Sequence, residues 1–375
     1  MFPADFAYAR ARSLDEALDL LDEAAQASQD AKLIAGGQSL LPMMKLRLAV
    51  PEVLIDIGGL KELRTSDYTA GPGGSFSMLL GALTTYRQLG RDLLPSADIP
   101  DRHPTDISAR HPAEGPARHP AAIPARHPSE GHPVDHDGQR GRAGAVPAMT
   151  DALAVLADPQ VRARGTVGGA VAHGDPAADL PAVLLALDAE VIIVSRTGRR
   201  EVALDDFLHG IYTTDLAADE VITHVRVSTA GARGSAYEKF PHPASHLPLA
   251  GVCAVLRLKD GLIDGAEVAV TGISPRPYRA RETERMLAGA DPAADSLAAA
   301  AARVTRLPDG SEATLLGDQH ASAPYRAHLA EVLTRRALAR ALARTEINLS
   351  CALNRGKRPS NTHNLRPPGG IRSWD

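Results

Sequence analysis

The stretch Ala35-Gly36-Gly37-Gln38-Ser39-Leu40-Leu41-Pro42 places a glycine pair in a short turn, and a second pair lies in Arg164-Gly165-Thr166-Val167-Gly168-Gly169-Ala170. Glycine has no Cβ, so the backbone can turn sharply and its N–H groups can approach an anion closely. Two such turns, far apart in the sequence, could close on the two sides of one pyrophosphate. Neither turn matches the G-x-G-x-x-G pattern of a dinucleotide-binding βαβ unit, so ordinary tight turns are an equal alternative at this point.

The sequence around the first turn predicts alternating helices and strands. A helix is expected over 14–29, with Ser13 as its N-cap and Glu16 completing a capping box. Short apolar runs predict strands at 32–35, 53–57 and 78–82. Strands that alternate with helices favour an α/β arrangement for this part of the chain.

The residues after 148 predict further helices and strands in two groups. The first group has helices at 148–157 and 180–187 and strands at 190–194, 202–204 and 220–227. The second has strands at 235–240, 249–259 and 262–273, and helices near 278–289, 295–305 and 324–345. Lys259-Asp260-Gly261 is typical of a hairpin turn. The second group therefore reads as a smaller α+β domain.

Residues 95–147 have a different composition. They contain no Leu and ten of the 28 prolines, and Arg-His-Pro recurs every eight residues from Arg102 to Pro128. Proline removes backbone donors, and few apolar side chains are present for burial, so we interpret 95–147 as a low-complexity, disordered insertion. Its six histidines could bind a metal, but a tandem expansion without function is the favoured interpretation. Disorder is also expected in the tail, 346–375.

Composition and charge exclude several functions. The chain has 375 residues and a net charge of −4, which argues against a nucleic-acid or membrane-surface partner. Its two cysteines, Cys253 and Cys351, have no metal-ligand spacing, so no metal site and no iron–sulfur ligation are expected within this chain. No apolar run approaches the roughly 20 residues of a membrane span, and the N-terminus has no signal-peptide pattern, so a cytoplasmic location is expected.

Four motifs in the same order resemble the FAD-binding medium subunit of the molybdenum hydroxylase family, of the aerobic carbon monoxide dehydrogenase and xanthine dehydrogenase type. They lie at 35–47, 159–179, 210–214 and 237–245. The resemblance covers about 1–94 and 148–340 and is interrupted by the insertion. Four ordered motifs are far more specific than either glycine pair alone.

The resemblance implies an α+β fold with a two-lobed FAD-binding domain of the vanillyl-alcohol-oxidase-like (PCMH) type and a smaller C-terminal α+β domain. The FAD-binding domain would then be residues 1–228, interrupted by the insertion 95–147. The C-terminal domain would be 229–345, followed by the tail 346–375. It also implies that this chain is one of three subunits. A large subunit would hold the molybdopterin cofactor and a small subunit two [2Fe–2S] clusters, and electrons would leave through FAD on this chain to an external acceptor.

The resemblance also assigns site residues. Binding of FAD would fall to Ala35, Gly36, Gly37, Gln38, Ser39, Thr166, Val167, Gly168, Gly169, Ala170, Asp179, Ile222 and Lys239. Asp179 would accept hydrogen bonds from cofactor hydroxyls, with a helix N-cap as the alternative. Lys239 would approach the polar edge of the flavin, with a solvated lysine as the alternative, and Ile222 would pack near the ring or simply in the core. Tyr212, the one residue assigned a catalytic place, would lie against the isoalloxazine ring and limit access to it. His173 and His242 are interpreted as turn residues.

Two rival functions stay open at this level. The enzyme rival is a stand-alone flavin oxidoreductase of the same fold, which would need a substrate pocket and a catalytic base of its own. The other is a degenerate, flavin-free paralogue that acts as a scaffold, or a metal-binding protein through its histidine repeat. The intact glycine pairs, Asp179 and Tyr212 argue against degeneration.

Overall fold

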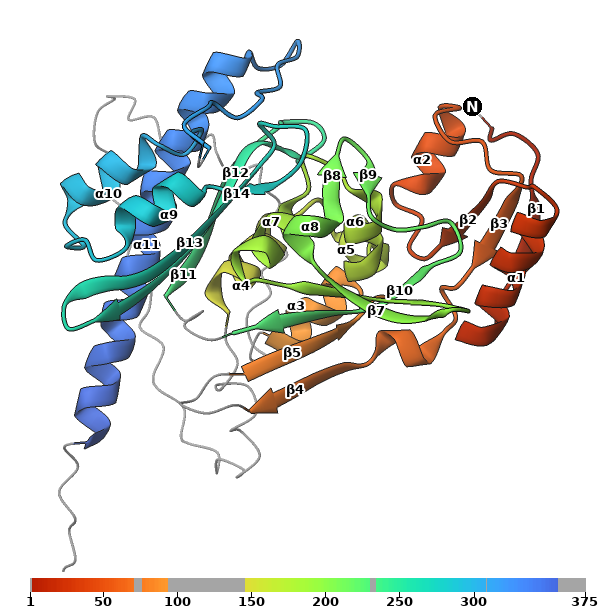
Figure 1. Ribbon diagram of the computed structural model, residues 1–375, viewed down its shortest axis with the longest axis horizontal. Helices are drawn as coiled ribbons and strands as arrows, with labels where there is room; N and C mark the ends of the chain where they lie inside the picture. Colours follow the sequence, from red (N-terminus) through yellow and green to blue (C-terminus); the bar gives the residue numbers. More distant parts are fainter. Residues whose placement is uncertain (1, 71–75, 94–145, 230–233, 308, 357–375) are drawn as a thin grey trace, which may run out of the picture.

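The chain folds into three bodies that follow one another in sequence. In a computed structural model, residues 2–70, 76–93, 146–229, 234–307 and 309–356 are described. Figure 1 shows an N-terminal lobe at one end, a central lobe, and a C-terminal domain at the other end. The mixed fold that was predicted, a two-lobed domain followed by a smaller α+β domain, is confirmed.

The N-terminal lobe is a parallel three-stranded sheet with a helix packed on it. Its strands are β1 (Ala7–Arg10), β2 (Ala31–Ile34) and β3 (Val53–Asp56), in the order β1-β3-β2, and its helices are α1 (Leu14–Gln26) and α2 (Leu40–Lys45). Ser13 caps α1 by accepting the Glu16 N–H at 3.1 Å, as the sequence predicted. Leu18 and Leu21 bury one face of this helix against the sheet. The first glycine turn follows β2, at the carboxyl edge of the parallel strands, where ligands of such sheets bind.

The central lobe is built on an antiparallel five-stranded sheet. Its strands are β4 (Ser66–Ala70), β5 (Phe76–Gly81), β6 (Glu190–Ser195), β7 (Gly198–Ala203) and β10 (Val221–Ser228), in the order β4-β5-β10-β6-β7, after the short η1 (Lys61–Arg64). Its helices are α3 (Tyr86–Leu93), α4 (Pro147–Val155), α5 (Pro159–Arg164), α6 (Val167–His173), α7 (Asp179–Ala186) and α8 (Leu204–Phe207), and a small sheet joins β8 (Leu208–Gly210) to β9 (Thr213–Thr214). Leu83 and Val221 of this lobe belong to the core of the N-terminal lobe, so the two lobes are packed together.

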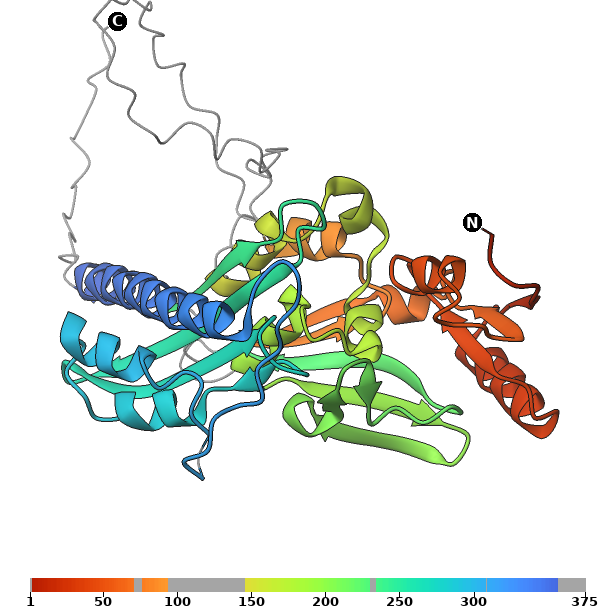
Figure 2. The same cartoon turned by 90° about the horizontal axis from the view of Figure 1, so that it is seen from above.

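The C-terminal domain is an antiparallel sheet buried on both faces. Its strands are β11 (Ser235–Pro241), β12 (Pro248–Lys259), β13 (Leu262–Thr271) and β14 (Tyr278–Arg279), and its helices are α9 (Arg281–Leu287), α10 (Ala294–Ala301) and α11 (Ala323–Gly356). Alternate residues point to opposite faces: Ala236 packs with the helices, whereas Tyr237 packs into the core of the central lobe. Figure 2 shows α11 lying along the sheet. Asp260 and Gly261 both have positive φ, which confirms the predicted hairpin turn.

Two predicted boundaries of disorder are wrong. Val146 is fully buried and Pro147 begins α4, because proline fits the first turn of a helix, so the predicted insertion 95–147 extends two residues too far. Helix α11 continues to Gly356, although disorder was predicted from 346, because no proline or glycine interrupts 346–355. The remaining predicted disorder, and the histidine repeat, lie outside the described residues.

Candidate functional site

A cavity of about 860 Å³ lies where the two lobes and one turn of the C-terminal domain meet, and we call it the interlobe cavity. This volume is in the range of ligand and cofactor sites. Its walls include both glycine turns, the first residue of α7, the β8–β9 turn, Ile222 on β10 and residues 245–247 of the C-terminal domain. All the predicted site residues line it except Val167, which is fully buried behind the wall, and Lys239.

The first glycine turn connects β2 to α2 and leaves its N–H groups open. Gly37 has φ +72°, a conformation that favours glycine. Within the described residues, the N–H groups of 36–40 have no hydrogen-bond acceptor, and the first one that does is Leu41, which donates to Gly37 O at 3.2 Å. Successive open N–H groups on a cavity wall form a nest that suits an anion.

The two glycine turns touch each other. A Cβ at Gly36 would lie 2.0 Å from the carbonyl oxygen of Arg164, at the start of the second turn. No larger residue fits there without moving one of the two backbones. The sequence suggested that the two turns could face one ligand, and the structure places them side by side in the wall of one cavity.

The second glycine turn uses its N–H groups within the protein. Val167 donates to Thr84 O at 3.0 Å and Gly168 to Ala82 O at 2.8 Å. Thr166 caps α6 by accepting the Gly169 N–H at 3.2 Å, and its carbonyl accepts the Ala170 N–H at 3.0 Å. The N–H groups of 168–170 are therefore engaged within the protein rather than open to a pyrophosphate, although these residues line the cavity.

The glycines of the second turn are required by packing. A Cβ at Gly168 would lie 2.5 Å from the Cβ of Ala82, and one at Gly165 would lie 2.5 Å from the ring of Tyr86. The backbone of the second turn approaches the end of β5 and helix α3 closely, and this close approach brings α6 against the central sheet. Here glycine serves the contact between elements rather than an open nest.

Asp179 stands buried at the cavity wall and is held by the C-terminal domain. Its side chain is 4% exposed, and its carboxylate accepts the Tyr237 hydroxyl at 2.7 Å and the Lys239 ammonium at 3.1 Å. Burial raises the pKa of Asp179, and the Lys239 and Tyr237 contacts oppose that rise. The alternative of a helix N-cap is excluded, because the residue before α7 is Ala178 and the Asp179 carboxylate bonds to β11 instead.

Lys239 lies behind Asp179 rather than in solvent or in the cavity. Its side chain is only 3% exposed, so the alternative of a solvated lysine is wrong. Besides Asp179, its ammonium donates to the carbonyl oxygen of His246 at 2.8 Å. Residues 245–247 line the cavity, so Lys239 contacts two parts of the wall without itself reaching it.

Tyr212 lies at the rim of the cavity in a strained conformation. It is 53% exposed, has φ +52°, and stacks on the His173 ring with 4.8 Å between centroids. Partial burial raises the pKa of Tyr212, with the nearby Asp175 carboxylate adding to the rise, and burial lowers the pKa of His173. A positive φ outside glycine costs about 1–3 kcal/mol and is retained where the surroundings impose it, often at functional sites.

Ile222 lines the cavity and is almost fully buried. The pairing of β10 with β6 shifts between Ile222 and His224. Such a bulge re-aims a side chain at the edge of a site. Ile222 therefore belongs both to the hydrophobic core of the central lobe and to the cavity wall.

Several wall residues were not predicted from the sequence. They include Leu33, Tyr86, Asp175 and, from the C-terminal domain, 245–247, and His173 was interpreted as a turn residue only. The one available signal was proximity in sequence, because Ser245 closes the motif that contains Lys239 and Asp175 lies in the motif of the second turn. The resemblance placed Lys239 of the C-terminal domain at the cofactor, and the structure brings the nearby turn 245–247 of that domain into the cavity wall.

In the part of the chain that the structure describes, no group of three or more His, Cys, Asp or Glu side chains is arranged to hold a metal ion. Among the same residues, no helix is long and apolar enough to cross a membrane.

Comparison with known families assigns both halves of the chain. Residues 4–229 match the family described as FAD binding domain in molybdopterin dehydrogenase, and 235–341 match the CO dehydrogenase flavoprotein C-terminal domain. The first match contains both glycine turns and nearly all of the cavity wall.

Individual proteins show the same likeness over almost their whole length. The glyceraldehyde dehydrogenase medium chain of Sulfolobus acidocaldarius is 31% identical over 90% of this chain and 98% of its own. The nicotine 6-hydroxylase medium subunit of Paenarthrobacter nicotinovorans is 33% identical over 90% and 98%. Among solved structures, a chain of carbon monoxide dehydrogenase from Hydrogenophaga pseudoflava is 32% identical, covers 92% of this chain and 99% of its own, and superposes with a TM-score of 0.71.

Proposed function

The chain belongs to the family of FAD-binding medium subunits of molybdenum hydroxylases, and we propose that it carries electrons out of a three-subunit enzyme of this kind. In this proposal FAD occupies the interlobe cavity, and the partners are a molybdopterin-binding large subunit and a [2Fe–2S] small subunit. The observation that supports it best is the open nest of N–H groups at 36–40 on the wall of a cavity of cofactor size.

The residues of the cavity fit the parts of FAD. A pyrophosphate is an anion and matches the nest of the first turn, which also precedes α2. Cofactor hydroxyls match the Asp179 carboxylate, whose Oδ2 keeps a further lone pair beside its contact with Lys239. The apolar Ile222 and the aromatic Tyr212 suit the two faces of a flat ring.

When bound, FAD would supply reversible electron transfer, and the chain's own residues supply binding and orientation. Gly36 to Ser39 would hold the phosphates, and Asp179 would hold a hydroxyl group. Tyr212 would cover the ring at the rim of the cavity and limit solvent access. Ala35, Thr166 and Gly168 to Ala170 would complete the wall, while Val167 and Lys239 support it from behind.

The other subunits are proposed from the relatives. The names "medium chain" and "medium subunit" indicate that those relatives belong to enzymes with further chains. In this proposal the site where substrate loses electrons lies on the partners. The external acceptor that takes the electrons would approach the rim of the cavity near Tyr212. A cytoplasmic location of this chain stays a prediction.

An absorbance spectrum of the purified full-length chain, before and after denaturation, tests the cofactor. We expect visible flavin bands, or their appearance after FAD is added, and release of FAD on unfolding because no covalent attachment is proposed. A colourless chain that also fails to take up FAD would overturn the proposal.

The partners are tested on the enzyme isolated from its source. We expect two further chains to co-purify, with molybdenum and iron detectable by metal analysis in a stable complex. Isolation of a flavin-loaded single chain without molybdenum or iron would favour a stand-alone flavin enzyme instead.

A further inference from the structure

The C-terminal domain holds the segment 176–179, which leads into α7, at the wall of the interlobe cavity. Besides the Asp179 contacts, the single O–H of Thr271 lies within hydrogen-bond distance of two carbonyl oxygens, Pro176 O at 2.8 Å and Ala178 O at 3.0 Å. The Gly272 N–H also donates to Pro176 O at 2.8 Å. The backbone that presents Asp179 to the cavity is therefore fixed from another domain.

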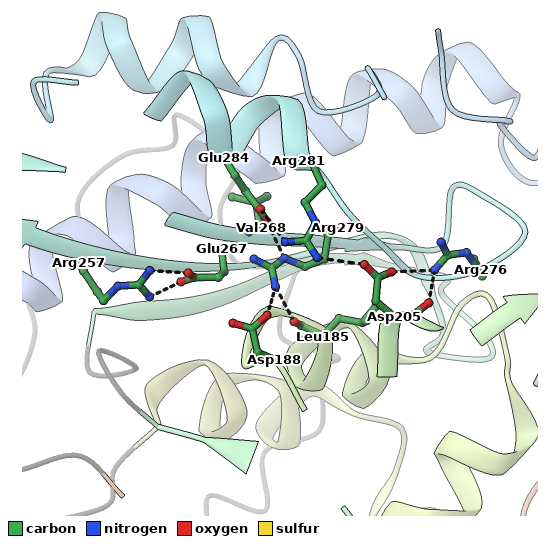
Figure 3. Close-up of polar contacts among 10 residues, drawn as sticks. All are labelled: Leu185, Asp188, Asp205, Arg257, Glu267, Val268, Arg276, Arg279, Arg281 and Glu284. Atoms are coloured by element: carbon green, nitrogen blue, oxygen red, sulfur yellow. Dashed lines mark hydrogen bonds and ion pairs between the residues drawn. The ribbon is translucent and has the colours of Figure 1, made fainter. Parts of the chain in front are cut away.

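The same domain holds the other end of α7 through a separate contact. Figure 3 shows the Arg279 guanidinium between the carbonyl oxygen of Leu185, the Asp188 carboxylate and the Glu284 carboxylate. Arg276 and Arg281 both reach Asp205 in the same view. Leu185 lies six residues after Asp179, about 9 Å further along the helix, so this contact supports α7 without touching Asp179.

We propose that Lys239 is a positioning residue for the cofactor site, through which the C-terminal domain holds Asp179 ionised and fixes the turn 245–247. The proposal rests on the function proposed above. Lys239 is the only described residue whose ammonium bonds to both Asp179 and the wall turn, through the carbonyl oxygen of His246. It does not line the cavity, so it acts through its two contacts rather than on the cofactor.

The charges around Asp179 explain why a cation is needed there. Asp179 is buried, the Asp175 carboxylate lies close enough to disfavour its ionisation, and the side chains of Tyr237 and Tyr86 are uncharged. A buried carboxylate without an opposite charge takes up a proton instead of staying ionised. A protonated Asp179 would have fewer lone pairs for a cofactor hydroxyl and would accept a weaker hydrogen bond.

The test is the pH dependence of FAD affinity in the full-length chain, measured by flavin fluorescence from about pH 5 to about pH 9. Affinity needs the carboxylate, so it falls as pH drops through the pKa of Asp179. Removing the Lys239 cation moves that pKa upward, so the fall in Lys239→Met occurs at higher pH than in the wild type. At neutral pH we expect about tenfold weaker binding, the loss for a hydrogen bond to a charged group.

Three further variants distinguish a role of Lys239 in positioning Asp179 from a general contribution to the stability of the fold. Lys239→Arg keeps the cation, so we expect the wild-type midpoint of the pH profile to return. Asp179→Asn has no carboxylate, so we expect weak binding at every pH. Arg279→Met removes the contact at the far end of α7, so we expect a lower melting temperature and an unchanged midpoint. Parallel profiles for the wild type and Lys239→Met would overturn the proposal.

The chain without FAD gives a second measurement, so failure of the two proposals can be distinguished. An acid whose pKa is raised on folding loses stability as pH rises between its unfolded and folded pKa values. Lys239→Met raises the folded pKa further, so its stability deficit relative to the wild type should widen with pH. If the wild type binds no FAD, the proposed function fails. If the stability deficit of Lys239→Met stays constant with pH, Lys239 does not hold Asp179 ionised, whether or not FAD binds.

Discussion

In the first glycine turn the N–H groups of 36–40 have no acceptor within the described residues, whereas four successive N–H groups of the second turn, 167–170, are all engaged. Glycine is required in both, but for different reasons. Gly36 lets the two turns touch, and Gly168 lets α6 pack on Ala82. A glycine pair therefore identifies a close backbone contact, and only the hydrogen-bond pattern shows whether its N–H groups bond to a ligand or to the protein.

The largest effect is expected at Gly168. In Gly168→Ala the new Cβ would meet Ala82 atoms at 2.5–2.9 Å, including backbone, so α6 must move away from β5. We expect a loss of about 1–3 kcal/mol in the free energy of unfolding, measured by urea denaturation of the chain without cofactor. Gly90→Ala is the matched control, because nothing lies within 4 Å of its Cβ. Equal stability of the two variants would contradict the packing role of the second turn.

A smaller but site-specific effect is expected at Gly36. In Gly36→Ala the Cβ would lie 2.0 Å from Arg164 O, so the two turns must separate and the nest must shift. We expect FAD affinity to fall by about tenfold or more, as charge-assisted hydrogen bonds to phosphate lengthen. Flavin fluorescence titration measures this, again with Gly90→Ala beside it. Wild-type affinity in a folded Gly36→Ala chain would show that the first turn is no nest.

The helix caps give a third effect. Thr166 caps α6 through its hydroxyl, so Thr166→Ala should lower the free energy of unfolding by about 1 kcal/mol. Because the N–H groups of 167–170 all have acceptors within the protein, this turn is not expected to donate to FAD, and we expect little change in FAD affinity beyond that caused by lost stability. A large loss of affinity with normal stability would instead give Thr166 a direct cofactor contact.

The smallest effect is expected at Ser39, the corresponding residue of the first turn. Its side chain makes no capping hydrogen bond to α2, so Ser39→Ala should change the free energy of unfolding by less than about 0.5 kcal/mol. Any effect should appear in FAD titration instead. A stability loss as large as that of Thr166→Ala would remove the difference between the two turns.

Local features of the fold were predictable because they depend on a few neighbouring residues. Ser13 caps α1, and Asp260-Gly261 forms the turn between β12 and β13. Helix ends were less predictable: α11 continues past 346 through residues that neither form a core pattern nor break a helix. Val146 was assigned to the insertion because its burial depends on a distant core.

The sequence by itself determined the two glycine turns, the fold class and the family, because backbone conformation and hydrophobic pattern are local properties that a motif records. Only the tertiary structure decided which N–H groups stay open and which are engaged, since the acceptors of the Val167 and Gly168 N–H groups are Thr84 and Ala82, some eighty residues earlier in the chain. It also decided that Lys239 lies behind Asp179, because an ion pair between strands and helices of different domains depends on how those domains pack.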